Sequence, residues 1–305
     1  MTPHVSVVIP TRNRRASLER ALASVDAQRF RDFEVVVVDD GSDDGTTSWV
    51  RSQHPGITLL ETGGPLGAAA ARNLGVQHSR GGIVAFLDDD DVWHPSVLAV
   101  QVAQLDANPE CDLCTTGHVE VDRQGRVFQP DLRPLNRYSD SMIHFLAECP
   151  IHTLSVVACR RTVFERLGPF DSTLAVVHDL DWYLRVIADG GKIAHHSPAL
   201  VERSVPGGLV TQHRRWFREE QAVHNRFFDA HAIERREKRL VRALRALFFA
   251  KVAFANGDFA FGLVRLAGAV LASPVDALRI ATRRLSRRSL RDTPETWDRQ
   301  AWEVR

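Results

Sequence analysis

The sequence predicts an α/β domain with a mainly parallel sheet, followed by an α-helical extension. Short apolar, β-branched runs alternate with helical segments through about the first 110 residues, which is typical of βαβ crossovers. Polar residues directly follow three of these runs. From about residue 216 the pattern becomes helical throughout. A chain of 305 residues, 44% hydrophobic and 25% charged, has room for one large globular domain and an appendage.

Four buried strands are expected in the first half, at residues 5–9, 33–38, 57–60 and 83–87. The segment after the first strand places Leu18, Ala21, Leu22 and Val25 at helical spacing. Further helices are expected at 46–53, at 68–78 after a glycine-rich turn, and at 97–107 after Pro95.

The fourth strand leads directly into four consecutive carboxylates, Asp88 to Asp91. These acids would repel one another without a positive partner, and Mg²⁺ or Mn²⁺ prefers carboxylate oxygens. The alternative is a solvated acidic loop that caps the next helix. Thr11 follows the first strand, and Asp39 and Asp40 follow the second. Because open α/β sheets bind ligands at the carboxyl ends of their strands, this arrangement favours a nucleotide-type site.

The second half is less regular. It predicts a hairpin at 119–128 that turns at 123–125, an irregular loop at 129–140 and a strand at 153–159. A turn at 168–171, a helix at 179–188 and a short strand at 199–201 follow.

The extension differs in charge from the body. Residues 1–215 contain 21 basic and 27 acidic residues, net −6, whereas 216–305 contain 18 and 11, net +7. One helix should carry a stripe of Leu240, Leu244, Leu247 and Phe248, and Asp258 should cap the next, at 259–272. A third should start at 273 and end in a basic run at 283–288. One interpretation is that these helices pack on the body of the protein or on a second subunit, which would give a homodimer. The other is that they lie in the plane of an anionic membrane surface.

Several classes of protein are disfavoured. Four cysteines, including a lone C-x-x-C at Cys111 and Cys114, indicate buried or inert thiols rather than disulfides or a zinc site. The first residues enter a strand without a signal-peptide pattern, and no apolar run reaches the ~20 residues that span a bilayer. We therefore expect a cytoplasmic protein, or one peripheral to the inner face of a membrane. The mixed charges of the tail do not indicate nucleic-acid binding.

Six motifs in order give the chain a family resemblance. They are VSVVIPTRN at 5–13, VVVDDGS at 36–42, GAAAARNLG at 67–75, VAFLDDDDVWHP at 84–95, GPFD at 168–171 and HDLDWYLR at 178–185. Over about 1–205 the chain resembles the family 2 inverting glycosyltransferases, which have a GT-A fold. The resemblance implies a Rossmann-like GT-A domain at 1–215, with a nucleotide-sugar half at 1–110 and an acceptor half at 111–215. Residues 216–305 form the extension.

The resemblance also implies the nucleotide contacts. Pro10, Thr11 and Asp40 match positions that hold the nucleobase and ribose. Asp39 is the less favoured neighbour, because alternate residues of a strand face apart. Arg72 matches a basic residue at the nucleotide site; the alternative is an arginine on the helix surface.

The remaining matches concern the metal and the base. Asp88, Asp89 and Asp90 match the D-x-D region, with Asp90 as the ligand of Mn²⁺ or Mg²⁺ and Asp88 or Asp89 contacting the ribose or supporting the metal ligand. Asp179 matches the catalytic base; an N-cap carboxylate is its alternative. Where the family commonly has an acid before the base, this chain has His178, expected to be a neutral neighbour.

These implications predict a metal-dependent inverting glycosyltransferase. It would move a sugar from a UDP- or dTDP-sugar to a hydroxyl of a glycan, lipid-linked or small-molecule acceptor, for example in cell-envelope polysaccharide assembly. Loops at 129–150 and 203–213 would shape the acceptor pocket, and His213 is a candidate additional metal ligand. One alternative is a catalytically silent nucleotide- or partner-binding module. Another is a nucleotidyltransferase, although the loop at 10–14 lacks the glycines of a phosphate loop.

Overall fold

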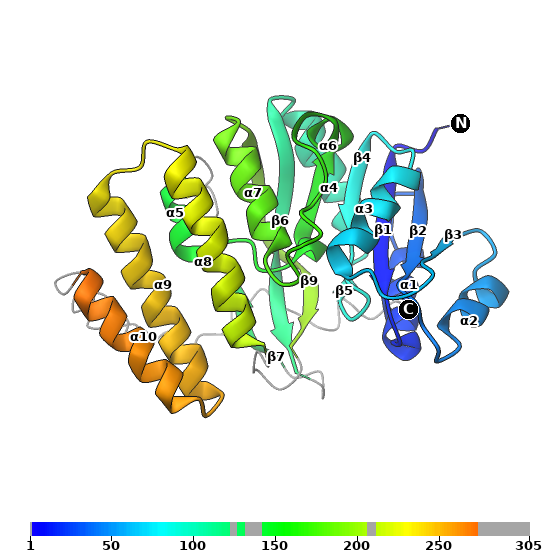
Figure 1. The fold of residues 1–305 in the computed structure, drawn as a ribbon. Helices are drawn as coiled ribbons and strands as arrows, with labels where there is room; N and C mark the ends of the chain where they lie inside the picture. The colour runs from blue at the N-terminus through cyan, green and yellow to red at the C-terminus, as the bar shows by residue number, and fades with distance from the viewer. Residues whose placement is uncertain (1, 123–126, 132–141, 206–211, 274–305) are drawn as a thin grey trace. The chain divides into compact units, whose positions relative to one another are not determined.

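The structure, a computed structural model, describes residues 2–122, 127–131, 142–205 and 212–273. These residues form two compact units (Figure 1). One contains the described residues of 2–131 and 151–205, and the other contains 142–150 and 212–273. The boundary between domains expected at 215/216 stays a prediction.

The described part of the first unit contains a nine-stranded mixed sheet with the order β3-β2-β1-β4-β8-β6-β9-β5, and β7 pairs with β6. The strands are β1 Val5–Thr11, β2 Phe33–Asp39, β3 Thr58–Glu61, β4 Ile83–Phe86, β5 Val92–Trp93, β6 Cys111–Val121, β7 Val127–Asp131, β8 Val157–Arg160 and β9 Lys192–Ser204. Strands β1 to β4 are parallel to one another, as are β6 and β9, whereas β8 runs antiparallel between β4 and β6. The predicted fold class is therefore confirmed.

Helices flank this sheet. They are α1 Arg15–Asp26, α2 Thr46–Gln53, α3 Ala68–His78, α4 Val97–Ala107, α6 Arg161–Leu167 and α7 His178–Ala188. Every residue of β1 is buried, as expected for an apolar strand covered on both faces. Helix α3 lies against it so closely that a Cβ on Gly75 would be 2.4 Å from Cγ1 of Val8. Glycine at this position lets the helix approach the strand.

The strand order creates the place for a site. The chain moves from β1 through β2 to β3 and then returns to β4 on the other side of β1. The segments that leave β1 and β4 are therefore neighbours, and the Leu87 N–H donates to the Val8 carbonyl at 3.1 Å. The Asp40 N–H likewise donates to the Thr11 carbonyl at 2.8 Å. Such a switch in strand order is where open α/β sheets bind ligands.

Several expectations for the second half were only partly correct. The strand expected at 153–159 begins only at Val157, as β8, and a 3₁₀ turn at Leu154–Val156 precedes it. The short strand at 199–201 is part of the thirteen-residue β9. Its pairing with β6 has register shifts, and its stability comes from cross-strand contacts that a single segment does not reveal. Residues 129–131 belong to β7, not to a loop. The turn at 123–125 and the loop at 132–140 lie outside the described residues.

The second unit is helical where it is described, as predicted from about residue 216 onward. Its first helix, α5 Met142–Glu148, was not predicted, because residues 129–150 were expected to form a loop. Its helices are α5 Met142–Glu148, α8 His213–Ala230, α9 Arg235–Ala255 and α10 Phe259–Ala272. Asp258 caps α10 as expected, accepting from the Phe261 N–H. Arg245 of α9 forms two 2.6 Å hydrogen bonds with Glu220 of α8, and both side chains are buried. The helix expected from 273 onward lies outside the described residues.

Two further sequence expectations concern the thiols and membrane spans. Cys111, Cys114 and Cys159 are free and buried, as predicted, and Cys149 is partly buried. Burial raises the pKa of Cys114 to about 12, so this thiol is unreactive at neutral pH. Among the helices described, none combines the length and the apolar character that crossing a membrane requires.

Candidate active site

The end of β1 provides a hydroxyl, and the loop after β1 provides a cation, to the carboxylates after β4. Asn13 adopts a left-handed conformation, with φ of 53°, which asparagine tolerates better than most residues. Its side chain and backbone hydrogen-bond to the loop after β2. This connection fixes the approach of Arg14, whose Nη1 lies 3.0 Å from Asp89 Oδ1 and 2.7 Å from Asp90 Oδ2. Thr11 donates to Asp89 at 2.8 Å.

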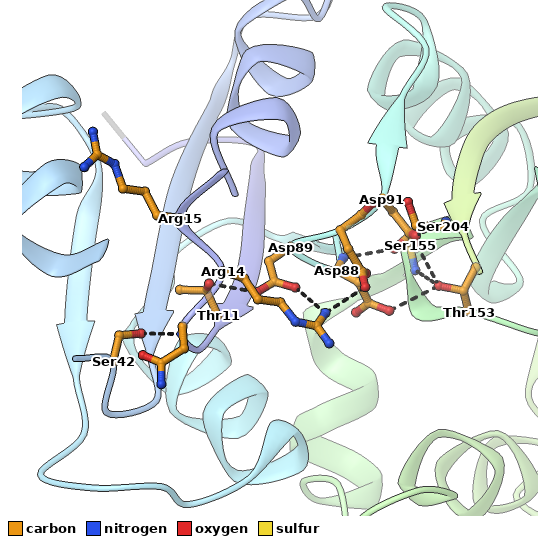
Figure 2. Close-up of polar contacts among 12 residues, drawn as sticks. Thr11, Arg14, Arg15, Ser42, Asp88, Asp89, Asp91, Thr153, Ser155 and Ser204 are labelled. Atoms are coloured by element: carbon orange, nitrogen blue, oxygen red, sulfur yellow. Dashed lines mark hydrogen bonds and ion pairs between the residues drawn. The ribbon is translucent and has the colours of Figure 1, made fainter. Parts of the chain in front are cut away.

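The four carboxylates lie between two groups of polar residues. Figure 2 shows Thr11 and Arg14 on one side of Asp88, Asp89 and Asp91, and Thr153, Ser155 and Ser204 on the other. The partners on the second side are hydroxyl groups and one backbone N–H. Thr153 donates to Asp91 at 3.2 Å and to Asp88 at 3.3 Å, the Ser204 N–H donates to Asp91 at 2.9 Å, and Ser155 Oγ accepts from the Asp88 N–H at 2.9 Å.

Crowding and burial change the proton affinity of these acids. Burial raises the pKa of Asp89 to about 6, against the opposing effect of Arg14. Burial, together with the negative charges of Asp88 and Asp90, raises the pKa of Asp91 to about 8. Burial and the negative charge of Asp88 likewise raise the pKa of Asp90, against the opposing effect of Arg14. A cluster whose charges are this costly would be stabilised by an additional cation.

Arg72 is buried and joins Asp88 to His178. Its guanidinium forms an ion pair with Asp88, and Nη1 lies 2.8 Å from Nε2 of His178. An arginine nitrogen is always a donor, so Nε2 of His178 is the acceptor. Burial and the positive charge of Arg72 lower the pKa of His178 to about 3. The histidine is therefore neutral, as the sequence suggested.

Asp179 is the second residue of α7, which begins at His178. It is half-buried, and its Oδ1 accepts from the Leu180 N–H at 2.8 Å. Burial raises its pKa to about 6, with the charges of Asp88 and Arg72 acting in opposite directions. Asp179 is not the N-cap of α7, because Val177 occupies that position. A carboxylate that is ionised at neutral pH yet basic enough to accept a proton suits a general base.

Asp40 has other partners. Its carboxylate accepts hydrogen bonds from the N–H groups of Leu66 at 2.7 Å and Gly67 at 2.9 Å, and from the Thr62 hydroxyl at 3.1 Å. Asp39 accepts from the Ser42 N–H at 2.9 Å and from Thr47. The two neighbours therefore face different loops, as alternation along a strand requires. A carboxylate offers about four acceptor positions, so Asp40 keeps capacity for a ribose hydroxyl.

The structure thus places Thr11, Arg72, Asp88, Asp89 and Asp90 in one connected network. Pro10 is buried in β1 beside Val38. Whether these positions form the predicted binding site stays a prediction, as do their functional roles. Sequence reasoning missed Arg14, Thr153, Ser155 and Ser204. Only Arg14 left a signal, since four adjacent acids require a nearby cation and the loop at 12–15 is basic.

The donor atoms here suit a hard divalent cation. Asp90 keeps 26% of its side chain exposed, and the Arg14 guanidinium lies against it, 52% exposed. A positive group therefore already occupies the position next to the carboxylate. No cluster of three or more His, Cys, Asp or Glu side chains suited to a metal occurs within the described residues. Binding of Mg²⁺ or Mn²⁺ here would therefore need the phosphates of a substrate beside one or two carboxylates, and it stays a prediction.

His213 belongs to the helical unit. Its Nε2 lies 2.9 Å from Asp258 Oδ2, and Arg214 pairs with the same carboxylate at 2.6 Å and 2.8 Å. These contacts connect the start of α8 to the start of α10. They give His213 a structural role, and its candidacy as a metal ligand stays a hypothesis.

Comparison with known proteins identifies the family. A family model described as "Glycosyl transferase family 2" matches residues 6–168. Over 181 residues the chain is 29% identical to the Escherichia coli protein "UDP-Glc:alpha-D-GlcNAc-diphosphoundecaprenol beta-1,3-glucosyltransferase WfgD", covering 59% of this chain and 67% of that protein. The chain spans about three fifths of the length of several curated relatives it matches.

Two solved structures share the fold. S. aureus TarS 1-349 in complex with UDP-GlcNAc has a TM-score of 0.62 at 20% identity, over 84% of this chain and 73% of that chain. The mannosyltransferase PcManGT from Pyrobaculum calidifontis, in complex with GDP-Man and Mn²⁺, has a TM-score of 0.57 at 24% identity, over 94% and 81%.

Proposed function

Because the chain belongs to glycosyl transferase family 2, we propose that it is a metal-dependent, inverting hexosyltransferase that uses a nucleoside-diphosphate sugar. The observation that supports this most strongly is that the carboxylates after β4 pair with two arginines, Asp89 and Asp90 with Arg14 and Asp88 with Arg72. The electrostatic influence of Arg72 and Asp88 also reaches Asp179. One site thus combines cations for a diphosphate with a candidate base.

The favoured donor is a UDP- or dTDP-sugar. Support for a uridine nucleotide comes from WfgD, named for UDP-Glc, and from the TarS complex with UDP-GlcNAc. Pro10, Thr11 and Asp40 would contact the base and ribose, with Asp88 or Asp89 beside them. The proposed donor-binding half is 1–110 and the acceptor half is 111–215, before the extension at 216–305.

Asp90 would hold Mn²⁺ or Mg²⁺ together with the donor diphosphate, and PcManGT offers a precedent for Mn²⁺. When bound, the metal supplies Lewis-acid stabilisation of negative charge on the departing phosphate. Arg72 is held rigidly by Asp88 and His178, which keeps a permanent positive charge at this site. Preorganised charge of this kind lowers a barrier because it needs no rearrangement during the reaction.

Asp179 would take the proton of the acceptor hydroxyl as its oxygen attacks the anomeric carbon. The new C–O bond forms on the face opposite the departing nucleoside diphosphate, whose C–O bond breaks with its electron pair. One displacement inverts the anomeric centre, so no protein nucleophile is required. Neutral His178 does not compete for the proton from Asp179, because its own pKa is about 3.

The acceptor is proposed to be a hydroxyl of a glycan, a lipid-linked sugar or a small molecule in cell-envelope polysaccharide assembly. The name of WfgD, with a diphosphoundecaprenol acceptor, supports the lipid-linked class. An enzyme with such an acceptor works at a membrane surface.

Calorimetry and thermal unfolding with nucleoside diphosphates, with and without Mn²⁺, test this proposal. Ligands that bind the folded state raise its apparent stability. We expect UDP or dTDP to stabilise the wild type when Mn²⁺ is present, and Asp90→Ala to lose this effect. Asp106→Ala, at an exposed position of α4, is the matched control and should behave like the wild type. Absence of binding by every nucleotide would favour a catalytically silent module instead.

A further inference from the structure

Helix α10 presents a wide apolar surface to solvent. Its exposed large side chains, here called the α10 apolar face, are Phe259, Leu263, Val264, Leu266, Val270 and Leu271. Leu271 is 85% exposed, Phe259 64% and Leu263 60%. Isolated apolar side chains on a surface are ordinary, but a contiguous group of this kind marks an interaction site.

The opposite side of α10 is occupied by packing within the unit. Gly262 lies against the Phe254 ring of α9, and Ala269 is fully buried. Arg265, the single charged residue of α10, lies 4.4 Å from the centre of the Phe217 ring of α8. Its charge is therefore used in an inward cation–π contact, and the outer surface of the helix is left without charge.

The neighbouring helix α9 is strongly basic. It contains seven basic residues and one acidic residue, and it lies beside α10 in the same unit (Figure 1). Its exposed basic residues are Arg235, Arg236, Arg239, Arg242 and Lys251. An apolar helix with a basic neighbour has the chemistry of an element that lies in the interface of an anionic bilayer.

Charge and length decide between the possible occupants of this surface. A symmetric contact with a second copy would bring two α9 helices of like charge together, which is unfavourable. A helix of 14 residues is about 21 Å long, short of the ~30 Å bilayer core, so it does not span a membrane. An anionic lipid surface satisfies both the apolar face and the basic helix.

We propose that the α10 apolar face inserts into the surface of an anionic bilayer, parallel to its plane, while the exposed basic residues of α9 contact the lipid headgroups. The apolar side chains would be buried among the lipid tails. The arginines and the lysine would be attracted to the anionic headgroups, and salt would weaken this attraction. This inference does not depend on the proposed transferase activity, because it rests on the helical unit alone.

Flotation of the full chain with lipid vesicles tests the proposal without any donor or acceptor. We expect binding to phosphatidylcholine vesicles that contain phosphatidylglycerol, little binding to phosphatidylcholine alone, and weaker binding as NaCl rises. The double variant Leu263→Glu/Leu271→Glu should bind at least about tenfold more weakly, because two exposed leucines no longer enter the bilayer. Arg239→Gln and Lys251→Gln should each cost about fivefold.

A control variant adds the same charge elsewhere. Ala23→Glu/Ala103→Glu changes two exposed helical positions in the other unit and should bind like the wild type. Circular dichroism and thermal unfolding check that all variants fold. The proposal is overturned if the chain does not float with anionic vesicles, or if the α10 variant and the control bind equally. It is also overturned if light scattering shows a dimer that only the α10 variant dissociates, because the occupant is then a second copy.

Discussion

Two groups of carboxylates lie at the carboxyl ends of β2 and β4, the strands on either side of β1, and they have different surroundings. Asp39 and Asp40, after β2, accept hydrogen bonds from backbone N–H groups and hydroxyls of adjacent loops. Asp88 to Asp91, after β4, are crowded together and lie against two arginines. In this second group the pKa values of Asp89, Asp90 and Asp91 are raised, whereas that of Asp88 is lowered despite its burial because Arg72 lies beside it.

The difference separates carboxylates that hold loops in place from carboxylates whose surroundings suit catalysis. A carboxylate bound by backbone N–H groups fixes the loops that donate to it, and this arrangement needs no ligand. A crowded cluster of partly buried carboxylates, by contrast, is stabilised by each positive group that lies against it. Sites of this second kind are typical of catalytic centres, where perturbed pKa values gather. The comparison therefore predicts different consequences for substitutions in the two groups of carboxylates.

The largest effect is expected for Asp179→Asn. This substitution tests whether Asp179, whose pKa is raised like those of three carboxylates after β4, is the catalytic base. Transferase turnover should fall by about 10²–10⁴-fold because the acceptor hydroxyl loses its proton acceptor. Nucleotide binding should persist. Because Asp179 acts as an ionised base with a pKa of about 6, wild-type kcat/KM should rise with pH up to about 6 and then level off. Initial rates across pH measure both effects.

Asp189→Asn is the control for this experiment. Asp189 follows the same helix at its far end, and its exposed side chain pairs with Arg166; surface pairs of this kind contribute little. It should retain activity and the pH profile. If Asp179→Asn stays active with the acidic limb of the profile intact, another group is the base.

The sequence predicted the first half of the fold well because each element there is defined by its own residues. Apolar runs such as 5–9 and 83–87 are buried on both faces, so their composition alone identifies them. Helices 68–78 and 97–107 agree with α3 and α4 at both ends. The edge that holds Thr11, Asp40 and Asp88 followed from the parallel sheet expected for such units, because ligands bind at the carboxyl ends of its strands.

The second half depended on contacts between distant segments. Strand β9 is stable because it pairs with β6 along its length and with β5 at its end, which its own polar sequence does not indicate. The same holds for the partners of the acids. Thr153 and Ser204 lie more than 60 and 110 positions from Asp91, and no local spacing connects them. The role of Arg14 was easier to predict, because four adjacent carboxylates in the sequence require a nearby cation.

A smaller effect, on stability, is expected for Asp91→Asn. In the folded protein Asp91 holds its proton up to about pH 8, whereas an unfolded chain releases it near about pH 4. The folded state thus binds the extra proton between these values, and stability falls as pH rises from about 4 to about 8. The loss is at most about 1.4 kcal/mol per pH unit. Asparagine does not titrate, so this part of the slope should vanish.

Urea unfolding of wild type and Asp91→Asn across this pH range measures the difference. The amide can still accept from the Ser204 N–H and donate to Thr153, which keeps the local contacts. The two proteins should have similar stability near about pH 4, and the variant should be the more stable near about pH 8. Asp106→Asn, which is exposed, should follow the wild type. Parallel curves for Asp91→Asn and wild type would show that Asp91 is ionised throughout.

The smallest effect is expected for Asp40→Asn, and its sign is the opposite. Both oxygens of Asp40 accept from backbone N–H groups, those of Leu66 and Gly67, so an amide would turn its NH₂ toward one of these donors. Leaving such a group unpaired costs about 1–3 kcal/mol, at every pH where the wild type is folded. Urea unfolding should show this loss, while Asp43→Asn, at an exposed position three residues away, should be nearly neutral. Unchanged stability in Asp40→Asn would mean that the loop at 62–67 does not depend on this carboxylate. The two groups of carboxylates would then differ only in their charged neighbours.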